Sequence, residues 1–87
     1  IAPYGDSVLT ADGKRILLAV GSDRQFLDLC DALNISEAAQ QPTYATNHQR
    51  VQHRQQLNDL LTAAMAKWNA TDLLARLHAL KVPCGLV

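Results

Sequence analysis

Residues 46–68, TNHQRVQHRQQLNDLLTAAMAKW, decide the fold because this long stretch contains neither Gly nor Pro. Its apolar residues follow the spacing i, i+3, i+4, i+7, i+8, i+11 and are Leu57, Leu60, Leu61, Ala64, Met65 and Trp68. This spacing forms one stripe of an α-helix. Thr46 is a suitable N-cap, and Gln49 follows three residues later, as in a capping box. We predict one helix of roughly 30 Å along which the other elements pack.

The first half of this helix is polar. Val51 is the only large apolar residue between Asn47 and Gln56. We therefore expect this half to reach the surface, and four basic or imidazole side chains with it: His48, Arg50, His53 and Arg54.

A β-hairpin precedes the helical part of the chain. Residues 6–10 are expected to form a short strand, and Asp12-Gly13 is a strong hairpin-turn signal because Gly accepts positive φ. Residues 14–20, KRILLAV, form the return strand, whose continuously apolar middle predicts burial on both faces.

Two shorter helices flank the long one. Ser22 and Gln25 form a capping box, and Asn34 is the expected left-handed terminator. The apolar face of this first helix consists of Phe26, Leu29, Cys30 and Leu33. One further turn is expected over residues 36–40, followed by a loop.

The last helix is expected to start at a Thr71 cap and to end at Val82-Pro83. Its apolar face consists of Leu73, Leu74, Leu77 and Leu80. CGLV then leaves as extended chain and is a candidate third strand. The order predicts an α+β fold, a small antiparallel β-hairpin or sheet packed against three main α-helices, as a single domain over residues 1–87.

Composition excludes several classes of function. The formal net charge is zero, which argues against nucleic acid or an anionic membrane as a partner. No apolar run approaches the length of a transmembrane helix. Two cysteines are too few for a disulfide framework, so we expect a reduced, cytoplasmic setting. The start IAPYGD and the end GLV suggest a piece excised from a longer chain.

No metal site or nucleophile is expected. His48 and His53 are five residues apart and so point to different sides of a helix, and His78 lies far off in sequence. Cys30 and Cys84 form no C-x-x-C pair, and neither has a base placed beside it in the sequence.

Arg50 and Arg54 stand one helical turn apart and are candidates for binding a phosphate or a partner carboxylate. We favour the alternative, a solvated face or pairing with nearby Asp or Glu, since such charges are common on surfaces. Tyr4, between Pro3 and Gly5, is a candidate functional loop residue because the turn holds an aromatic ring in an irregular segment.

Three stretches together resemble one family: IAPYGDSVLTADGKRILLAVGSDRQFLDLC, PTYATNHQRVQHRQQL and ARLHALKVPCGLV. In this order and spacing they resemble the small domain of family III CoA-transferases, the CaiB/BaiF family, over essentially the whole chain. Two departures lie at the exit from the domain. Lys81 stands where the family commonly has Gly, and Leu86 stands where Pro is usual after C-G.

The resemblance implies a division of labour. A large α/β domain would supply the nucleophilic Asp and most contacts with coenzyme A, which is a substrate of the full-length enzyme. This chain would carry no catalytic residue, no metal and no cofactor. Its expected partners are the large domains of its own and of a second subunit in an interlocked homodimer. Pro3, Tyr4 and Gly5 correspond to a loop that covers the active site in formyl-CoA transferase.

We therefore expect the small domain of an acyl-CoA transferase, covering an active-site cleft and inactive alone. Two alternatives remain open: the small domain of an α-methylacyl-CoA racemase-like member, and a helical interaction module binding through residues 50–54. A domain cut from an enzyme should expose apolar residues that once faced a neighbour, such as Ile1, Tyr4, Val82, Leu86 and Val87.

Overall fold

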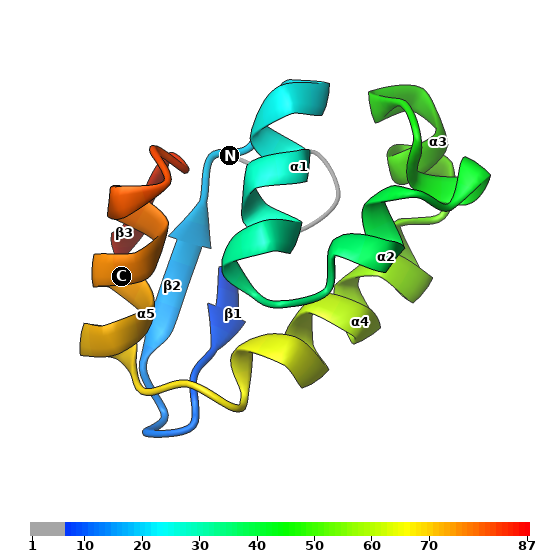
Figure 1. Ribbon diagram of the computed structural model, residues 1–87. Helices are drawn as coiled ribbons and strands as arrows, with labels where there is room; N and C mark the ends of the chain where they lie inside the picture. Colours follow the sequence, from blue (N-terminus) through cyan, green and yellow to red (C-terminus); the bar gives the residue numbers. More distant parts are fainter. Residues whose placement is uncertain (1–6) are drawn as a thin grey trace.

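The computed structural model describes residues 7–87 as helices packed on one face of a three-stranded antiparallel sheet (Figure 1). In chain order the elements are β1 (Ser7–Leu9), β2 (Arg15–Leu18), α1 (Asp23–Ala32), α2 (Ser36–Ala39), η1 (Pro42–Tyr44), α3 (Asn47–Gln52), α4 (Arg54–Met65), α5 (Ala70–Ala79) and β3 (Cys84–Leu86). The sheet order is β1-β2-β3. The predicted α+β class is confirmed, and so is the third strand.

The hairpin forms where the sequence predicts it. Val8 on β1 lies opposite Ile16 on β2, and the connecting turn closes with a hydrogen bond of 2.8 Å from the Thr10 N–H to the Lys14 carbonyl. Gly13 has φ +76° in this turn, a conformation that L side chains rarely adopt. On the other side of β2, Leu18 lies opposite Cys84 of β3.

Burial alternates along β2 and the two residues after it, so the expectation of burial on both faces is wrong. Ile16, Leu18 and Val20 are buried, whereas Leu17 is half-buried and Ala19 is exposed. The reason is that the helices of the described chain cover only one face of the sheet (Figure 1). An apolar run shows that a strand has two apolar faces, but it does not show what covers the second face.

The predicted signals at both ends of α1 are confirmed. The Ser22 hydroxyl accepts a bond from the Gln25 N–H at 3.1 Å, and the Gln25 side chain accepts one from the Ser22 N–H at 3.2 Å. At the other end Asn34 has φ +60°, and the Ile35 N–H donates to the Cys30 carbonyl at 2.9 Å. These are a complete capping box and a Schellman-type end.

The end of α5 has the same geometry as the end of α1, although it lacks Gly or Asn. Lys81 adopts φ +60°, and its N–H donates to the His78 carbonyl at 3.0 Å. The Val82 N–H donates to the Leu77 carbonyl at 2.8 Å. The replacement noted in the sequence therefore leaves the shape of the turn intact and places a side chain in the left-handed region.

The single long helix predicted for residues 46–68 is divided in two, which corrects the sequence interpretation. Its expected cap is correct, because the Thr46 hydroxyl accepts a bond from the Gln49 N–H at 3.2 Å. The helix breaks at His53, whose ψ of +29° leaves the helical range, and α4 starts at the next residue. Neither Gly nor Pro lies at the break, so no helix-breaking residue marks it in the sequence.

The N-cap of α5 is Asn69 and not Thr71. The Asn69 side-chain oxygen accepts a bond from the Asp72 N–H at 2.8 Å, and the Asn69 amide donates to the Asp72 carboxylate at 3.0 Å. Asn is as good a cap as Thr or better, and it comes first along the chain, so the helix starts there.

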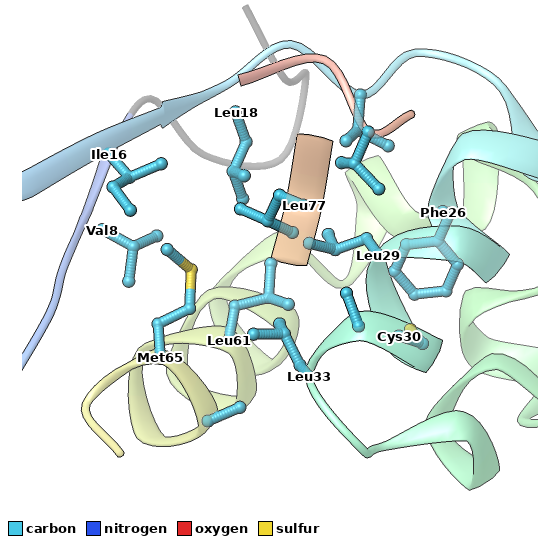
Figure 2. Close-up of a cluster of buried hydrophobic side chains, with 14 of the residues drawn as sticks. Val8, Ile16, Leu18, Phe26, Leu29, Cys30, Leu33, Leu61, Met65 and Leu77 are labelled. Atoms are coloured by element: carbon cyan, nitrogen blue, oxygen red, sulfur yellow. The ribbon is translucent and has the colours of Figure 1, made fainter. Parts of the chain in front are cut away.

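The hydrophobic core lies between the sheet and helices α1, α4 and α5. In Figure 2, Ile16 and Leu18 of β2 point toward side chains from all three of these helices. Six representative residues, all at most 1% exposed, are Ile16, Phe26, Leu29, Leu61, Met65 and Leu77. Of the four apolar residues predicted for the last helix, Leu73 and Leu77 are buried, Leu74 is half-buried and Leu80 is 36% exposed.

Candidate functional site

Arg50 is a buried arginine, with only 1% of its surface exposed. Its Nη2 atom lies 2.7 Å from Oδ1 of Asp23, in the first turn of α1, and its Nη1 atom donates to the Tyr44 carbonyl at 2.9 Å. It is the buried side chain of α3. Burying a guanidinium is costly unless its donors are satisfied, so this contact set fixes where α3 lies.

Aromatic rings complete the surroundings of this guanidinium. The Arg50 Cζ atom lies 4.6 Å from the centroid of the Phe26 ring, within cation–π range. The Phe26 and Tyr44 rings meet edge to face, with centroids 6.5 Å apart. Arg50, Asp23, Phe26 and Tyr44, which we call the Arg50 cluster, connect α1, η1 and α3.

The surface position expected for Arg50 is therefore wrong, whereas the expected alternative of pairing with an Asp or Glu is confirmed by Asp23. Arg50 forms a buried ion pair with Asp23, which lies 27 positions away in sequence. The spacing of nearby residues does not reveal such a partner. Arg54 is exposed, as expected. The two arginines thus sit in different environments, and their contact with an anion or a partner stays a prediction.

Asp12, expected only as a turn residue, also connects the hairpin to α5. Its Oδ1 atom accepts bonds from the Thr10 hydroxyl at 2.5 Å and from the Ala70 N–H at 3.1 Å. The Thr10 bond is the largest cause that lowers the pKa of the Asp12 carboxyl below its usual value. Next to it, the Ala11 N–H donates to the Trp68 carbonyl at 2.8 Å.

Neither thiol is activated. Cys30 is buried in the core, and desolvation raises its pKa to about 12. Desolvation also raises the pKa of the half-buried Cys84 thiol. Both groups are therefore protonated at neutral pH, which removes the thiolate that nucleophilic attack needs.

The histidines do not converge. His48 and His78 are exposed, while the Nδ1 atom of the half-buried His53 lies 2.9 Å from the Gln49 carbonyl. Among residues 7–87, no group of three or more His, Cys, Asp or Glu side chains is arranged to hold a metal ion.

The proposed active-site loop residues Pro3, Tyr4 and Gly5 lie outside the described residues. Of the apolar residues expected to face a neighbour, Leu86 and Val87 are exposed, whereas Val82 is buried and does not fit that expectation. No helix in residues 7–87 combines the length and apolarity needed to cross a membrane.

One surface depression is not predicted by any sequence motif. It has a volume of about 420 Å³ and lies between the end of α1 and the segment after α4. Leu33, Asn34, Ile35, Lys67 and Trp68 line it. No acid–base pair converges in it, so it offers shape without catalytic chemistry.

Comparisons with known proteins point to one family. The family model described as CoA-transferase family III matches residues 1–87, the whole chain. A succinate–glutarate CoA-transferase of Agrobacterium fabrum is 42% identical over 85 residues, covering 98% of this chain and 21% of that protein. A succinyl-CoA:glutarate CoA-transferase of Mus musculus is 33% identical over 85 residues, covering 98% of this chain and 19% of that protein.

A solved structure has the same fold. The crystal structure of a CaiB/BaiF family protein from Brucella suis matches with a TM-score of 0.89 and 40% identity, covering 98% of this chain and 22% of that one. The chain thus spans about a fifth of the length of the curated relatives it matches.

Proposed function

Because this chain belongs to CoA-transferase family III, we propose that it is a domain of an acyl-CoA transferase that moves CoA between carboxylic acids. The observation that carries the proposal is the match of the family model to all 87 residues. The transferase names of both relatives favour this reaction over racemisation. We call the longer protein the parent enzyme.

The proposed role of the domain is to cover the active-site cleft of the larger domain, in its own or in a second subunit of an interlocked dimer, so that cover and cleft come from different parts of the parent enzyme. The carboxylates of Asp12, Asp23 and Asp72 support it. Each is engaged in a bond that holds local structure, with Thr10, Arg50 and Asn69 respectively.

The proposed reaction needs a carboxylate nucleophile that attacks the acyl-CoA carbonyl and expels the CoA thiolate, giving a mixed anhydride. The thiolate then attacks the enzyme's own carbonyl, which releases the first acid and leaves an enzyme-bound thioester. An acceptor carboxylate repeats the two steps in reverse. The proposed cover excludes water, which would otherwise hydrolyse both intermediates.

The substrate class follows from the relatives' names. Both name a succinate or succinyl group together with glutarate, two short dicarboxylic acids. We propose that the parent enzyme transfers CoA from succinyl-CoA to a dicarboxylic acid of similar length. The substrates named for the two relatives remain a proposal for this protein, because the chain spans about a fifth of either relative.

The test is a transfer assay with the purified parent enzyme. With succinyl-CoA and glutarate we expect glutaryl-CoA and free succinate, detected by mass spectrometry. The 87-residue chain alone, at the same concentration, should give no exchange. Exchange catalysed by the isolated chain would refute the division of labour, and a parent enzyme that forms no acyl-CoA product would refute the transferase.

The loop Pro3-Tyr4-Gly5 is proposed as part of the cover, on the family resemblance of its position. Tyr4→Ala and Gly5→Ala in the parent enzyme should increase hydrolysis of succinyl-CoA relative to transfer. An unchanged ratio of hydrolysis to transfer in both variants would remove this loop from the cover.

A further inference from the structure

The face of the sheet that points away from the helices has an unusual composition for a face in water. Strand alternation and the observed register assign to it Ser7, Leu9, Arg15, Leu17, Ala19, Gly85 and Val87. An antiparallel sheet with one solvated face normally carries polar residues at such positions. Here the set includes no Asp, Glu or Lys. We call these residues the outer sheet face.

Exposure confirms that the described residues leave this face largely uncovered. Leu9 is 42% exposed and Val87 is 75% exposed. These two residues flank Arg15 of β2. Leu9 on β1 lies opposite Arg15, and on the β3 side the Val87 N–H donates to the Arg15 carbonyl at 3.0 Å. The row from Leu9 on β1 through Arg15 on β2 to Val87, the residue after β3, is therefore apolar, cationic and apolar.

Gly85 adds a second observation. It lies within β3, directly opposite Leu17, and its φ is not positive. A Cβ atom added to it would meet nothing within 4 Å. Nothing in the described fold therefore requires a glycine there. Glycine within a strand often marks a place where another backbone approaches closely.

Arg15 indicates the chemistry expected of a partner surface. Its Nη1 atom donates to the Ser7 hydroxyl at 3.3 Å, while a guanidinium has five N–H donors in all. Arginine surrounded by apolar side chains is typical of the centre of a protein interface, where Lys and Glu are depleted. A surface complementary to this face would be apolar, with a carboxylate opposite Arg15.

We infer that the outer sheet face docks against the part of the parent enzyme outside these 87 residues, through an apolar surface with a carboxylate facing Arg15. The inference rests on the proposed function, which makes this chain one domain of a longer protein. The curated relatives supply the argument for this occupant, since about four fifths of their length lies outside the match.

Site-specific cross-linking in the parent enzyme tests this inference. Leu9→p-benzoylphenylalanine places a photoreactive ketone on the outer sheet face, and irradiation followed by peptide mass spectrometry identifies the residue it reaches. The matched control is Leu27→p-benzoylphenylalanine, since Leu27 is 38% exposed but lies on α1. We expect Leu9 to cross-link efficiently to peptides outside the 87 residues, and Leu27 to do so several-fold less.

Each other result overturns the inference. Cross-links from Leu9 only to peptides within the 87 residues would assign the face to a second copy of this domain or to the chain itself. No cross-link, or equal yields from Leu9 and Leu27, would mean that the face is not an interface. Cross-linking needs no turnover, so it separates failure of the docking from failure of the transferase proposal.

A charge test examines the carboxylate separately. Arg15→Glu in the parent enzyme should lower the melting temperature more than Arg24→Glu, because Arg24 has an 81% exposed side chain on α1 and loses only a surface ion pair with Asp28 at 3.4 Å. Equal shifts for the two variants would exclude a carboxylate opposite Arg15.

Discussion

At the scale of single residues, Arg50 shows the largest difference between the position expected from the sequence and the position in the structure. Its guanidinium is enclosed by Asp23, the Tyr44 carbonyl and the Phe26 ring. Asp23 keeps 61% of its side chain exposed, so the two partners of this ion pair are not equivalent. The arginine is the buried member, so losing the Asp23 oxygen would leave a buried cation without its partner, whereas losing Arg50 leaves an exposed carboxylate and the Tyr44 carbonyl without a donor.

Arg50→Met tests this asymmetry. The variant keeps an apolar stem but leaves the Tyr44 carbonyl without its donor, and we expect it to lower the free energy of unfolding by about 2 kcal/mol. Asp23→Asn should cost less than about 1 kcal/mol, because the amide oxygen can still accept the bond from Arg50 Nη2 and solvent screens the charge that is lost. Urea denaturation measures both. Equal losses of stability in the two variants would mean that the ion pair, and not the bond to the Tyr44 carbonyl, accounts for the stabilisation.

Asp12 predicts a dependence of stability on pH. Its pKa is lowered in the folded state, mainly by the Thr10 hydroxyl, so the ionised form favours folding. This contribution is present above the pKa of the unfolded chain and is lost as the pH falls through the lower folded pKa. Melting curves between neutral and strongly acidic pH should show Asp12→Asn less stable than the wild type near neutrality and less sensitive to acid. Parallel curves would contradict this.

Lys81 carries a third prediction at this scale. Its φ of +60° is unfavourable for a side chain, so Lys81→Gly should raise the free energy of unfolding by about 0.5–1 kcal/mol. Lys81→Ala is the control, since it removes the amine but keeps the Cβ atom. If both variants stabilise the protein equally, the charge and not the backbone is responsible.

At the scale of elements, caps determine where helices begin. Asn69→Ala removes the bond to the Asp72 N–H and should cost about 1 kcal/mol of stability, whereas Thr71→Ala should be nearly neutral because Thr71 is already inside α5. Chemical denaturation of the two variants decides between these start points. A larger loss for Thr71→Ala would restore the start predicted from sequence.

The elements also show how far sequence reasoning reaches. Signals of short range were read correctly: the Gly13 turn, the capping box at Ser22 and the left-handed Asn34 each depend on residues a few positions apart. The break at His53 was missed, because neither Gly nor Pro marks it in the sequence. The ion pair of Arg50 with Asp23 was missed for a different reason, since helical periodicity gives no information about a partner on another helix.

The same limit applies to the candidate site. The polar half of the long stretch was expected to be a surface, and that expectation was right for Arg54 and wrong for Arg50. The role of Asp12 at the start of α5 was also missed, because Ala70 is 58 positions away. The resemblance, which uses the order of several motifs, carried the family assignment better than any single residue did.

At the scale of the whole molecule, one core joins the sheet to the helices. Leu29 is fully buried at its centre, and Leu29→Ala should lower the free energy of unfolding by about 2–5 kcal/mol. Leu86→Ala, at a residue 56% exposed, should cost much less in the 87-residue chain. Thermal unfolding compares the two, and similar losses would mean that the core is not where stability is concentrated.

The tertiary bond between the Ala11 N–H and the Trp68 carbonyl has a practical consequence. Trp68 is the one tryptophan of the sequence, and it stands where the hairpin turn meets the segment after α4. Its indole emission therefore reports optically on that junction, without an attached dye. A stopped-flow fluorescence trace would time the moment at which ribbon and helices come together during refolding.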